Sequence, residues 1–296
     1  MRLWDPMANK HFGNWADVFK HLALCEVLRL HQPHEYWESH AGAARYPLES
    51  GAERAHGIAY FLDHASESGV LQKSTYVQQL AQIHNGQALA FFPGSPWLAM
   101  KLLGENVRRY LFCDTDDESL RDIVNAAADL HVPPASAECV QDDGVTIVRG
   151  AGVMLPDRWT GGTMAFLDPY DALEERAGQI DTLGLFCELA TRGIVVLMWY
   201  GFENEPQRKR LHEEFVKRLD RARLLGGNIG QYESALAQPP AGTAPPTLYG
   251  CGLLTANMSN DAGAAVEGCV RALTGVYRGA KLEGWGSGAV EFTKLR

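Results

Sequence analysis

The sequence contains no Cys-x-x-Cys pair and no cysteine–histidine spacing of the kind that forms a zinc site. Its six cysteines stand singly, at positions 25, 113, 139, 187, 251 and 269. Three of them lie in apolar runs, as buried thiols do, and unpaired core thiols are typical of a reducing compartment. We therefore expect no metal site and a cytoplasmic protein.

Long apolar runs are also missing. No segment approaches 18 uninterrupted apolar residues, and the N-terminal stretch MRLWDPMANK has no apolar run of signal-peptide length. We expect a soluble protein without a membrane partner. Its 296 residues, 46% hydrophobic and 21% charged, are enough for one α/β domain with an insertion or for two small domains.

Basic residues are outnumbered in this chain. The 27 lysines and arginines face 36 acidic residues, which gives a formal net charge of −9. Such a charge disfavours a whole-protein basic field that holds nucleic acid nonspecifically. A local basic patch that includes Lys10, Arg45, Arg149 and Arg158 stays open.

Two familiar catalytic signatures are absent. A dinucleotide-dependent dehydrogenase needs Gly-x-Gly-x-x-Gly after its first strand, and the stretch HAGAAR does not supply it. A hydrolase of the α/β type needs Gly-x-Ser-x-Gly, which is not found either.

Strand-like and helix-like segments alternate over most of the chain. Buried strands are predicted at 108–116, 163–170, 194–202 and 247–258, an edge strand at 288–295, and a short strand within 35–46. Helices are predicted at 14–32, 98–104, 118–131, 182–193, 205–225 and 264–279, and residues 145–150 fit one further strand. Strands separated by helices predict an α/β fold with a mostly parallel sheet, and residues 51–90 look like a helical insertion.

Polar residues follow four of the predicted strands, in the stretches ESHAGA, CDTDD, DPYD and WYGFE. In an open parallel sheet, ligands bind outside the carboxyl ends of the strands. Acids at these places also serve as helix caps for purely structural reasons. A shared ligand crevice and a set of caps both stay open at this point.

Five motifs occur in a fixed order, namely GNWADVFKH, SHAGAARYPL, FPGSP, CDTDD and LDPYD. Together they resemble the bacterial 23S rRNA adenine-N6 methyltransferase family, and the resemblance extends over most of the chain. It implies S-adenosylmethionine as cofactor and a Rossmann-like class I methyltransferase fold. The catalytic domain would comprise residues 1–46 and 91–296, and residues 47–90 would form a helical insertion subdomain.

The resemblance also implies a cofactor site. His40 would touch the methionine part of the cofactor, Asp114 the ribose hydroxyls and Asp143 the adenine amine, while small residues after His40 let the backbone approach closely. Taken alone, the same residues fit a tight turn, helix caps and an Asp-Gly turn. The predicted cofactor-binding residues are His21, His40, Gly42, Ser95, Asp114, Asp143, Gly144 and Asp168. For Ser95, helix capping and cofactor binding are both open.

The predicted catalytic residues are Asp168, Pro169, Tyr170 and Lys20. Adenine-N6 methyltransferases generally carry Asp-Pro-Pro-Tyr, in which the acid and a proline carbonyl hold the exocyclic amine and the aromatic ring stacks on the base. Here one proline is missing. If the loop is one residue shorter, Tyr170 can still stack; otherwise Asp171 occupies the stacking position. Lys20 would lie near the cofactor and acceptor, although a lysine at this spacing is also common on a solvated helix face.

A second acceptor element of the family, Tyr-x-His shortly before Gly-Asn, is replaced by WDPMANKHF, where Trp4 and His11 are possible substitutes. Two altered acceptor motifs beside intact cofactor motifs favour methyl transfer to a small molecule, an amino acid or a peptide. One alternative is N6-methylation of an adenine in 23S rRNA. Another is a protein that binds the cofactor without transferring the methyl group. We expect a monomer or a weak dimer.

Overall fold

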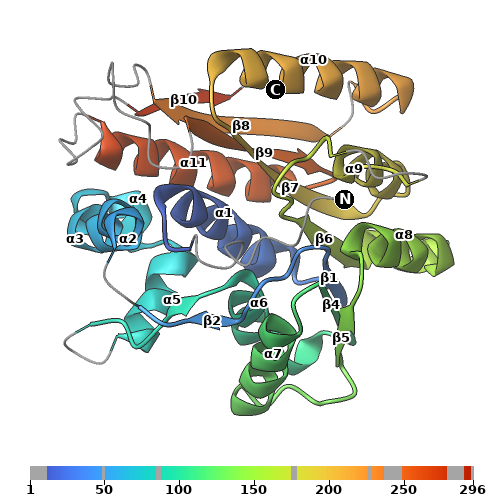
Figure 1. The fold of residues 1–296 in the computed structure, drawn as a ribbon, viewed down its shortest axis with the longest axis horizontal. Coiled ribbons are helices and arrows are strands. Elements are labelled where there is room, and N and C mark those ends of the chain that lie inside the picture. The colour runs from blue at the N-terminus through green and yellow to red at the C-terminus, as the bar shows by residue number, and fades with distance from the viewer. Residues whose placement is uncertain are drawn as a thin grey trace.

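A computed structural model describes residues 12–48, 51–84, 88–174, 179–225, 228–236, 249–278 and 290–294. Their main feature is an eight-stranded sheet in the order β10-β8-β9-β7-β6-β1-β4-β5 (Figure 1). The strands are β1 (Glu35–Glu38), β4 (Arg109–Asp114), β5 (Ala137–Gln141), β6 (Thr163–Leu167), β7 (Val195–Phe202), β8 (Ile229–Leu236), β9 (Gly250–Ala256) and β10 (Val290–Lys294).

The five strands from β5 to β7 run parallel, whereas β9 is antiparallel to both of its neighbours and β10 is antiparallel to β8. The fold is therefore α/β with a mostly parallel sheet, as the sequence predicts. A separate antiparallel pair consists of β2 (Arg45–Tyr46) and β3 (Phe92–Pro93).

Helices cover both faces of the sheet. They are α1 (Trp15–His31), α2 (Ala52–Arg54), α3 (Tyr60–His64), α4 (Gly69–Gln72), α5 (Thr75–Ile83), α6 (Ser95–Leu103), α7 (Asp117–Asp129), α8 (Gly144–Met154), α9 (Thr182–Thr191), α10 (Glu205–Arg221) and α11 (Asn260–Tyr277). A π-helical turn spans Ala55–Ala59, and short 3₁₀ turns span Ala65–Glu67, Gly104–Asn106 and Asp157–Gly162.

Successive residues of a strand point to opposite faces of the sheet, so the buried strands serve two cores. Tyr36 and Phe112 belong to the core beneath α1, α6, α7 and α11, while Trp37 and Leu111 belong to the core beneath α8, α9 and α10. Because both faces are covered, the central strands are mostly apolar and do not alternate with polar residues, although β1 begins and ends with a buried glutamate. β6 and β9 are buried at every position.

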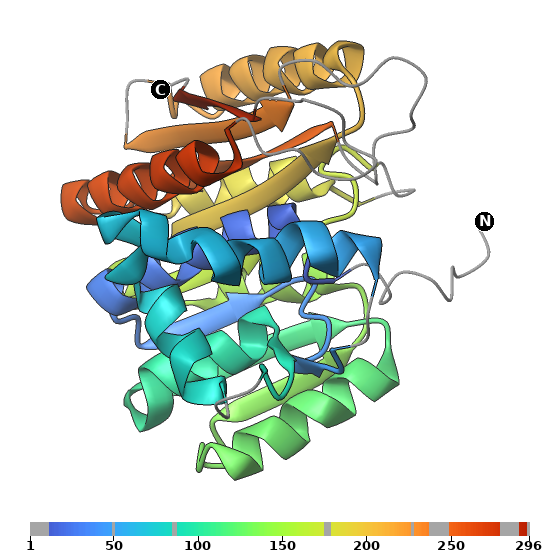
Figure 2. The same cartoon turned by 90° about the vertical axis from the view of Figure 1, so that its left-hand side faces the viewer.

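The predicted insertion is helical from Ala52 to Ile83 (Figure 2). It packs on α1 and α11, and its buried side chains, among them Ile58, Phe61, Leu71 and Leu80, share one core with those two helices. The insertion is therefore joined to the main body by a continuous apolar contact.

Three local expectations are wrong or incomplete. Residues 145–150 form part of helix α8 and not a strand, because Asp143 caps the helix by accepting the backbone N–H of Thr146 at 3.2 Å. The strands β5 and β8 were not predicted: β5 is a half-exposed edge strand, and β8 has polar residues such as Gln231 and Glu233 on its buried face. Trp4, His11 and Lys10 lie outside the described residues.

Candidate active site

The predicted strand ends meet at one edge of the sheet. β4, β1, β6 and β7 are consecutive parallel neighbours, so their carboxyl ends deliver Asp114, Glu38, Asp168 and Glu203 to the same side. The loops are joined there by backbone hydrogen bonds, from Ala41 to Cys113 at 2.9 Å and from Ser39 to Phe166 at 3.3 Å.

A largely buried ion-pair cluster lies after β6. Lys20 Nζ is 2.6 Å from Asp168 Oδ2 and 2.8 Å from Asp17 Oδ1, and the three side chains are only 10–16% exposed. Burial alone would lower the pKa of Lys20, but the two carboxylates more than offset this and raise it above its usual value. Burial raises the pKa of Asp168, and the adjacent ammonium opposes that rise. Lys20 is thus a charged, oriented partner of Asp168 and not a solvated surface lysine.

The neighbouring aromatic residues Trp199 and Tyr200 on β7 point to opposite faces of the sheet. Trp199 faces this cluster, and Tyr200 faces the core on the other side. Lys20 Nζ lies 5.4 Å from the centroid of the partly buried Trp199 ring, within cation–π range. Tyr200 is fully buried on the other face, where its hydroxyl donates to Glu233 at 2.7 Å. Only Trp199 therefore belongs to the candidate site.

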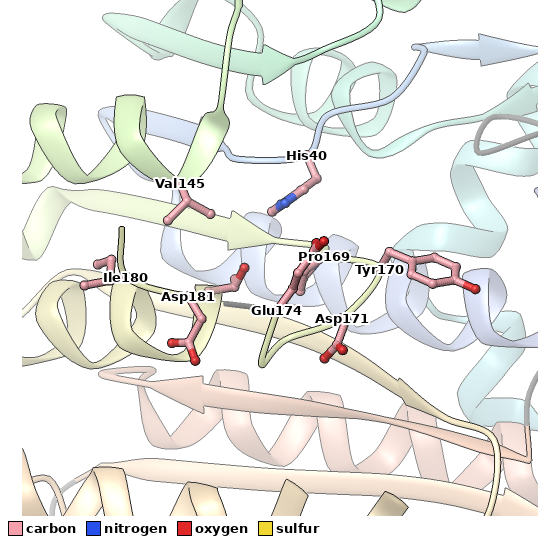
Figure 3. A pocket seen from close by; sticks show the side chains of 9 residues that line it. His40, Val145, Pro169, Tyr170, Asp171, Glu174, Ile180 and Asp181 are labelled. Atoms are coloured by element: carbon pink, nitrogen blue, oxygen red, sulfur yellow. The ribbon is translucent and has the colours of Figure 1, made fainter. Parts of the chain in front are cut away.

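The loop after Asp168 presents a tyrosine to solvent. Pro169 is buried, whereas Tyr170 is 91% exposed and points away from the side chains around it (Figure 3). Asp171 Oδ1 accepts the backbone N–H of Leu173 at 2.9 Å and so closes an Asx-type turn. The exposed ring next to Asp168 is that of Tyr170, while the Asp171 carboxylate is used to close the loop.

A fully buried carboxylate, Glu38, ends β1. It accepts hydrogen bonds from the Tyr36 hydroxyl at 2.8 Å and from the Ser95 hydroxyl at 2.7 Å. Burial raises the pKa of Glu38 to about 8, the two hydroxyls counteract part of this effect, and the negative charge of Asp168 adds to it. Of the two roles left open for Ser95, helix capping is not formed, because Gly94 is the N-cap of α6 and the Ser95 hydroxyl donates to Glu38.

The glycines of the predicted cofactor loops lie where neighbouring loops pack closely. Gly42 has φ +62° and donates its N–H to Asp114 Oδ2 at 2.8 Å. A Cβ on Gly144 would lie 1.8 Å from the Ser39 carbonyl oxygen, so no side chain fits there without moving the backbone. The loops after β1 and β4 and the start of α8 thus form one close-packed cradle.

The two predicted histidines differ in their surroundings. The half-buried His40 shares a 2.8 Å hydrogen bond with the Ser39 hydroxyl, and its ring points toward Pro169 (Figure 3). His21 is 3% exposed and packs against the rings of Tyr76 and Phe92. Burial lowers the pKa of His21 well below its usual value, and the charge of Lys20 adds to this. Its buried Nδ1 atom has no hydrogen-bond partner among the described residues.

Asp143 caps α8, with Oδ2 accepting from the Thr146 hydroxyl at 2.6 Å. Asp143 is thus a helix cap and not part of the simple Asp-Gly turn that the sequence suggests, and a ligand contact would be additional to the cap. Asp114 accepts from Gly42 and from the backbone of Asp116, so it braces its loop and does not cap α7.

Two members of the anticipated basic patch are neutralised by neighbours. Arg45 pairs with Asp122 and Asp129, and Arg149 pairs with Glu188. The side chain of Arg158 and all of Lys10 lie outside the described part of the chain. In the described part of the chain, Arg45 and Arg149 therefore do not form a patch of unpaired positive charge.

A small pocket of about 60 Å³ lies beside the loop after β6. Ligand sites usually measure about 300–1,000 Å³, so this hollow accommodates only part of a ligand. It is lined by His40, Val145, Pro169, Tyr170, Asp171, Glu174, Ile180, Asp181 and Thr182 (Figure 3).

Two further features concern only the described residues. No group of three or more histidine, cysteine, aspartate or glutamate side chains is placed to hold a metal ion there. Likewise, none of the helices in those segments has the length and apolarity needed to cross a membrane.

The structure brings into the site two residues that sequence reasoning did not single out, Asp17 and Glu38. Asp17 belongs to the motif GNWADVFKH and lies three residues before Lys20. On a helix this i,i+3 spacing places the two side chains next to each other, which is the sequence feature that indicates their pairing. Glu38 ends a strand that is buried on both faces, where a carboxylate must find hydrogen-bond donors.

Comparison with known proteins gives a consistent result. The family model described as "Ribosomal RNA large subunit methyltransferase D, RlmJ" matches residues 31–228. Two relatives, each named "Ribosomal RNA large subunit methyltransferase J", are 31% identical to this chain. The one from Escherichia coli (strain K12) matches over 104 residues, 32% of this chain and 36% of the relative; the one from Haemophilus influenzae matches over 111 residues, 34% and 39%. These alignments thus span little more than a third of either relative.

A solved structure from Legionella pneumophila str. Philadelphia 1, a protein of the DUF519 family, superposes with a TM-score of 0.71 over 96% of this chain and 97% of its own. At 20% sequence identity the likeness concerns the fold alone.

Proposed function

Because the chain belongs to the family of ribosomal RNA large subunit methyltransferases whose model matches residues 31–228, we propose that it is an S-adenosylmethionine-dependent enzyme that methylates the N6 amine of an adenine in 23S rRNA. The observation that carries this proposal is the buried Lys20–Asp168 pair beside an exposed Tyr170. We also propose a cytoplasmic protein that acts as a monomer or weak dimer.

The residues present fit the proposed cofactor. Gly42 and Gly144 let the loops after β1 and β4 and the start of α8 pack closely together. The Nδ1 atom of His21, which has no hydrogen-bond partner among the described residues, is a buried polar atom that a ligand could satisfy. His40, Asp114 and Asp143 add polar groups at neighbouring strand and helix ends, and Ser95 reaches the same region through Glu38. When bound, S-adenosylmethionine supplies an electrophilic methyl group on a sulfonium.

The acceptor half of the site fits an aromatic amine. An exocyclic amine conjugated with a ring is a poor nucleophile, and acceptors that bind its hydrogens favour the pyramidal nitrogen. Asp168 and the Pro169 carbonyl would be these acceptors. Lys20 keeps Asp168 ionised and fixed, because its ammonium occupies Oδ2 at 2.6 Å and leaves further lone pairs on the carboxylate. The ring of Tyr170 would stack on the flipped-out base.

The acceptor preference drawn from the sequence receives no support from the comparisons. The two altered acceptor motifs favour a small molecule, an amino acid or a peptide. The family match supports ribosomal RNA instead. The position of Tyr170 agrees with a loop one residue shorter, in which the tyrosine keeps the stacking role.

The test measures cofactor binding and methyl transfer in one sample. The protein is titrated calorimetrically with S-adenosylmethionine and then given unmodified 23S rRNA fragments with methyl-labelled cofactor. Label recovered as N6-methyladenosine supports the proposal. Binding without RNA labelling favours a small acceptor or a cofactor-binding protein without transfer, and absence of binding rejects the cofactor and the mechanism together.

A further inference from the structure

The segment that begins α1, the helix that carries Lys20, is held by the helical insertion at Gly13 and at the N-cap Asn14. Ile58 in the π-helical turn Ala55–Ala59 donates its backbone N–H to the Gly13 carbonyl at 2.9 Å. A Cβ on Gly57 would lie 2.0 Å from that carbonyl oxygen and 2.5 Å from backbone carbons of Asn14. The two backbones therefore touch at Gly57, where the insertion chain kinks and only a glycine fits.

The clamped segment is also the N-cap of α1. Asn14 Oδ1 accepts the backbone N–H groups of Ala16 at 2.9 Å and of Asp17 at 3.0 Å. In return, Asn14 donates its own N–H to Asp17 Oδ2 at 3.3 Å, which completes a capping box. One oxygen of the Asp17 carboxylate is thereby fixed to the cap.

The other oxygen of Asp17 is fixed to Lys20. Asp17 Oδ1 lies 2.8 Å from Lys20 Nζ, and the same ammonium lies 2.6 Å from Asp168 Oδ2. Asp17 is only 10% exposed, so water screens the interaction little. A hydrogen-bonded and ion-paired path thus runs from the insertion through the cap and Asp17 to Lys20 and Asp168.

We propose that Asp17 is a positioning residue, which ties Lys20 to the clamped start of α1 so that the insertion sets the placement of Lys20 against Asp168. The inference rests on the proposed methyl transfer and adds a residue that acts through Lys20. Its physical basis is the flexibility of a lysine side chain, which a single partner does not fix. A displacement of about 1 Å at a reacting group can reduce the rate roughly a hundredfold.

The decisive variant is Asp17→Asn. Asparagine has the same size and keeps a hydrogen-bond acceptor at the N-cap, but it removes the negative charge of residue 17 that faces the Lys20 ammonium. Its matched control is Glu26→Gln. Glu26 lies on the same helix, is 6% exposed and also contacts the insertion, since it accepts the Thr75 N–H at 2.7 Å. We expect Asp17→Asn to lower kcat at least tenfold and to change the cofactor Kd less than twofold, while Glu26→Gln leaves kcat within twofold.

Two further readouts separate positioning from general damage. Asp17 raises the pKa of Asp168 through its charge, so Asp17→Asn should move the acid limb of the kcat profile to lower pH. Acetylation of Lys20 by acetic anhydride, followed by mass spectrometry, needs no activity. We expect it to be at least threefold faster in Asp17→Asn than in the wild type and unchanged in Glu26→Gln.

The contact between the insertion and the start of α1 is tested by the variant Gly57→Ala, with Gly69→Ala as its control. Gly69 belongs to the same insertion, and a Cβ there would meet nothing within 4 Å. A kcat lowered at least fivefold in Gly57→Ala alone, with Lys20 acetylation accelerated, supports the inference even if Asp17→Asn fails to fold. Equal behaviour of the two glycine variants, or of Asp17→Asn and Glu26→Gln, overturns it. If the wild type labels no RNA but acetylation follows the expected order, the proposed function fails and the Asp17–Lys20 link stands.

Discussion

Asp168 and Lys20 form a largely buried ion pair. Removing either side chain leaves the charge of the other without this partner. Asparagine at 168 keeps the shape but removes the negative charge opposite the ammonium. Loss of one group aimed at the reacting centre typically costs about 10²–10³-fold in rate. We predict that Asp168→Asn reduces methyl transfer to RNA by about that factor and changes the cofactor Kd less than tenfold.

The control for this prediction is Asp171→Asn, an exposed carboxylate three residues away that closes the loop turn. It should retain transfer within about threefold. Equal losses in both variants, measured by label incorporated at saturating cofactor, would mean that loop shape and not the Asp168 charge governs the rate.

Tyr170 offers a separate test of the acceptor, because it is 91% exposed and lies next to Asp168. Stacking on a base is worth about 1–3 kcal/mol, whereas the tyrosine hydroxyl adds little to it. We predict that Tyr170→Ala lowers kcat/KM for RNA by at least fivefold, while Tyr170→Phe stays within twofold of the wild type. A phenylalanine variant as weak as the alanine variant would assign the role to the hydroxyl and reject stacking.

At the scale of an element, the end of β1 carries a pH-dependent contribution to stability. The pKa of Glu38 is about 8 in the folded chain and near 4.5 in an unfolded one, because burial disfavours its charged form. Between these values the native state binds one proton that the unfolded state does not. Stability therefore falls as pH rises from about 4.5 to 8.

This linkage predicts that Glu38→Gln, which is neutral at every pH, flattens the decline of the unfolding free energy between pH 5 and pH 8. Urea unfolding followed across that range measures it. The variant keeps a partner for the Tyr36 and Ser95 hydroxyls, so its stability at pH 5 should lie close to that of the wild type. Parallel pH curves for the two proteins would show that Glu38 is already ionised in the native state.

The start of α8 gives a prediction about the cofactor cradle. In Gly144→Ala the new Cβ would meet the Ser39 carbonyl at 1.8 Å, so the loop after β1 must move. We predict at least a tenfold weaker cofactor Kd by calorimetry. In Gly150→Ala, on the same helix with open space around the new Cβ, the Kd should not change and helix stability should rise by about 0.5–1 kcal/mol. Equal Kd values for the two variants would exclude this cradle from the cofactor site.

The sequence predicts elements well where apolar residues repeat over a long stretch, as in α1, β6 and β7. It fails where burial depends on a distant partner. The glutamate of β8 is buried because Tyr200, Arg208 and His212 converge on it, and a local pattern does not contain those contacts. At 145–150 the β-branched residues favoured a strand, but the cap at Asp143 and packing against α9 favour a helix.

The same limit applies to the candidate site. The order of the motifs predicts the family and the edge of the sheet at which the strand ends meet. It does not predict that the Ser95 hydroxyl donates a hydrogen bond to Glu38, or that Asp17 forms an ion pair with Lys20, because such pairings depend on side-chain distances in the folded chain.

At the scale of the whole molecule, the acidic balance constrains how an RNA can be held. The net charge is −9, and Arg45 and Arg149 are already paired with carboxylates. Those two guanidinium groups are not available to phosphates, so we expect binding to rely on base contacts such as stacking and on few phosphate contacts. With two or three phosphate contacts, the slope of log K against log salt is about −1.4 to −2.1 for single-stranded RNA.

We therefore predict that raising salt from 50 to 200 mM weakens binding of a 23S rRNA fragment by about 7–20-fold, far less than the 10³–10⁵-fold typical of proteins with six to ten phosphate contacts. Fluorescence anisotropy of a labelled fragment measures this. Arg45→Gln and Arg149→Gln should leave the slope unchanged, because neither guanidinium is available to a phosphate. A slope steeper than about −4 would require a basic surface formed by other residues. In that case the RNA would be held mainly through its backbone, and the stacking role of Tyr170 would become secondary.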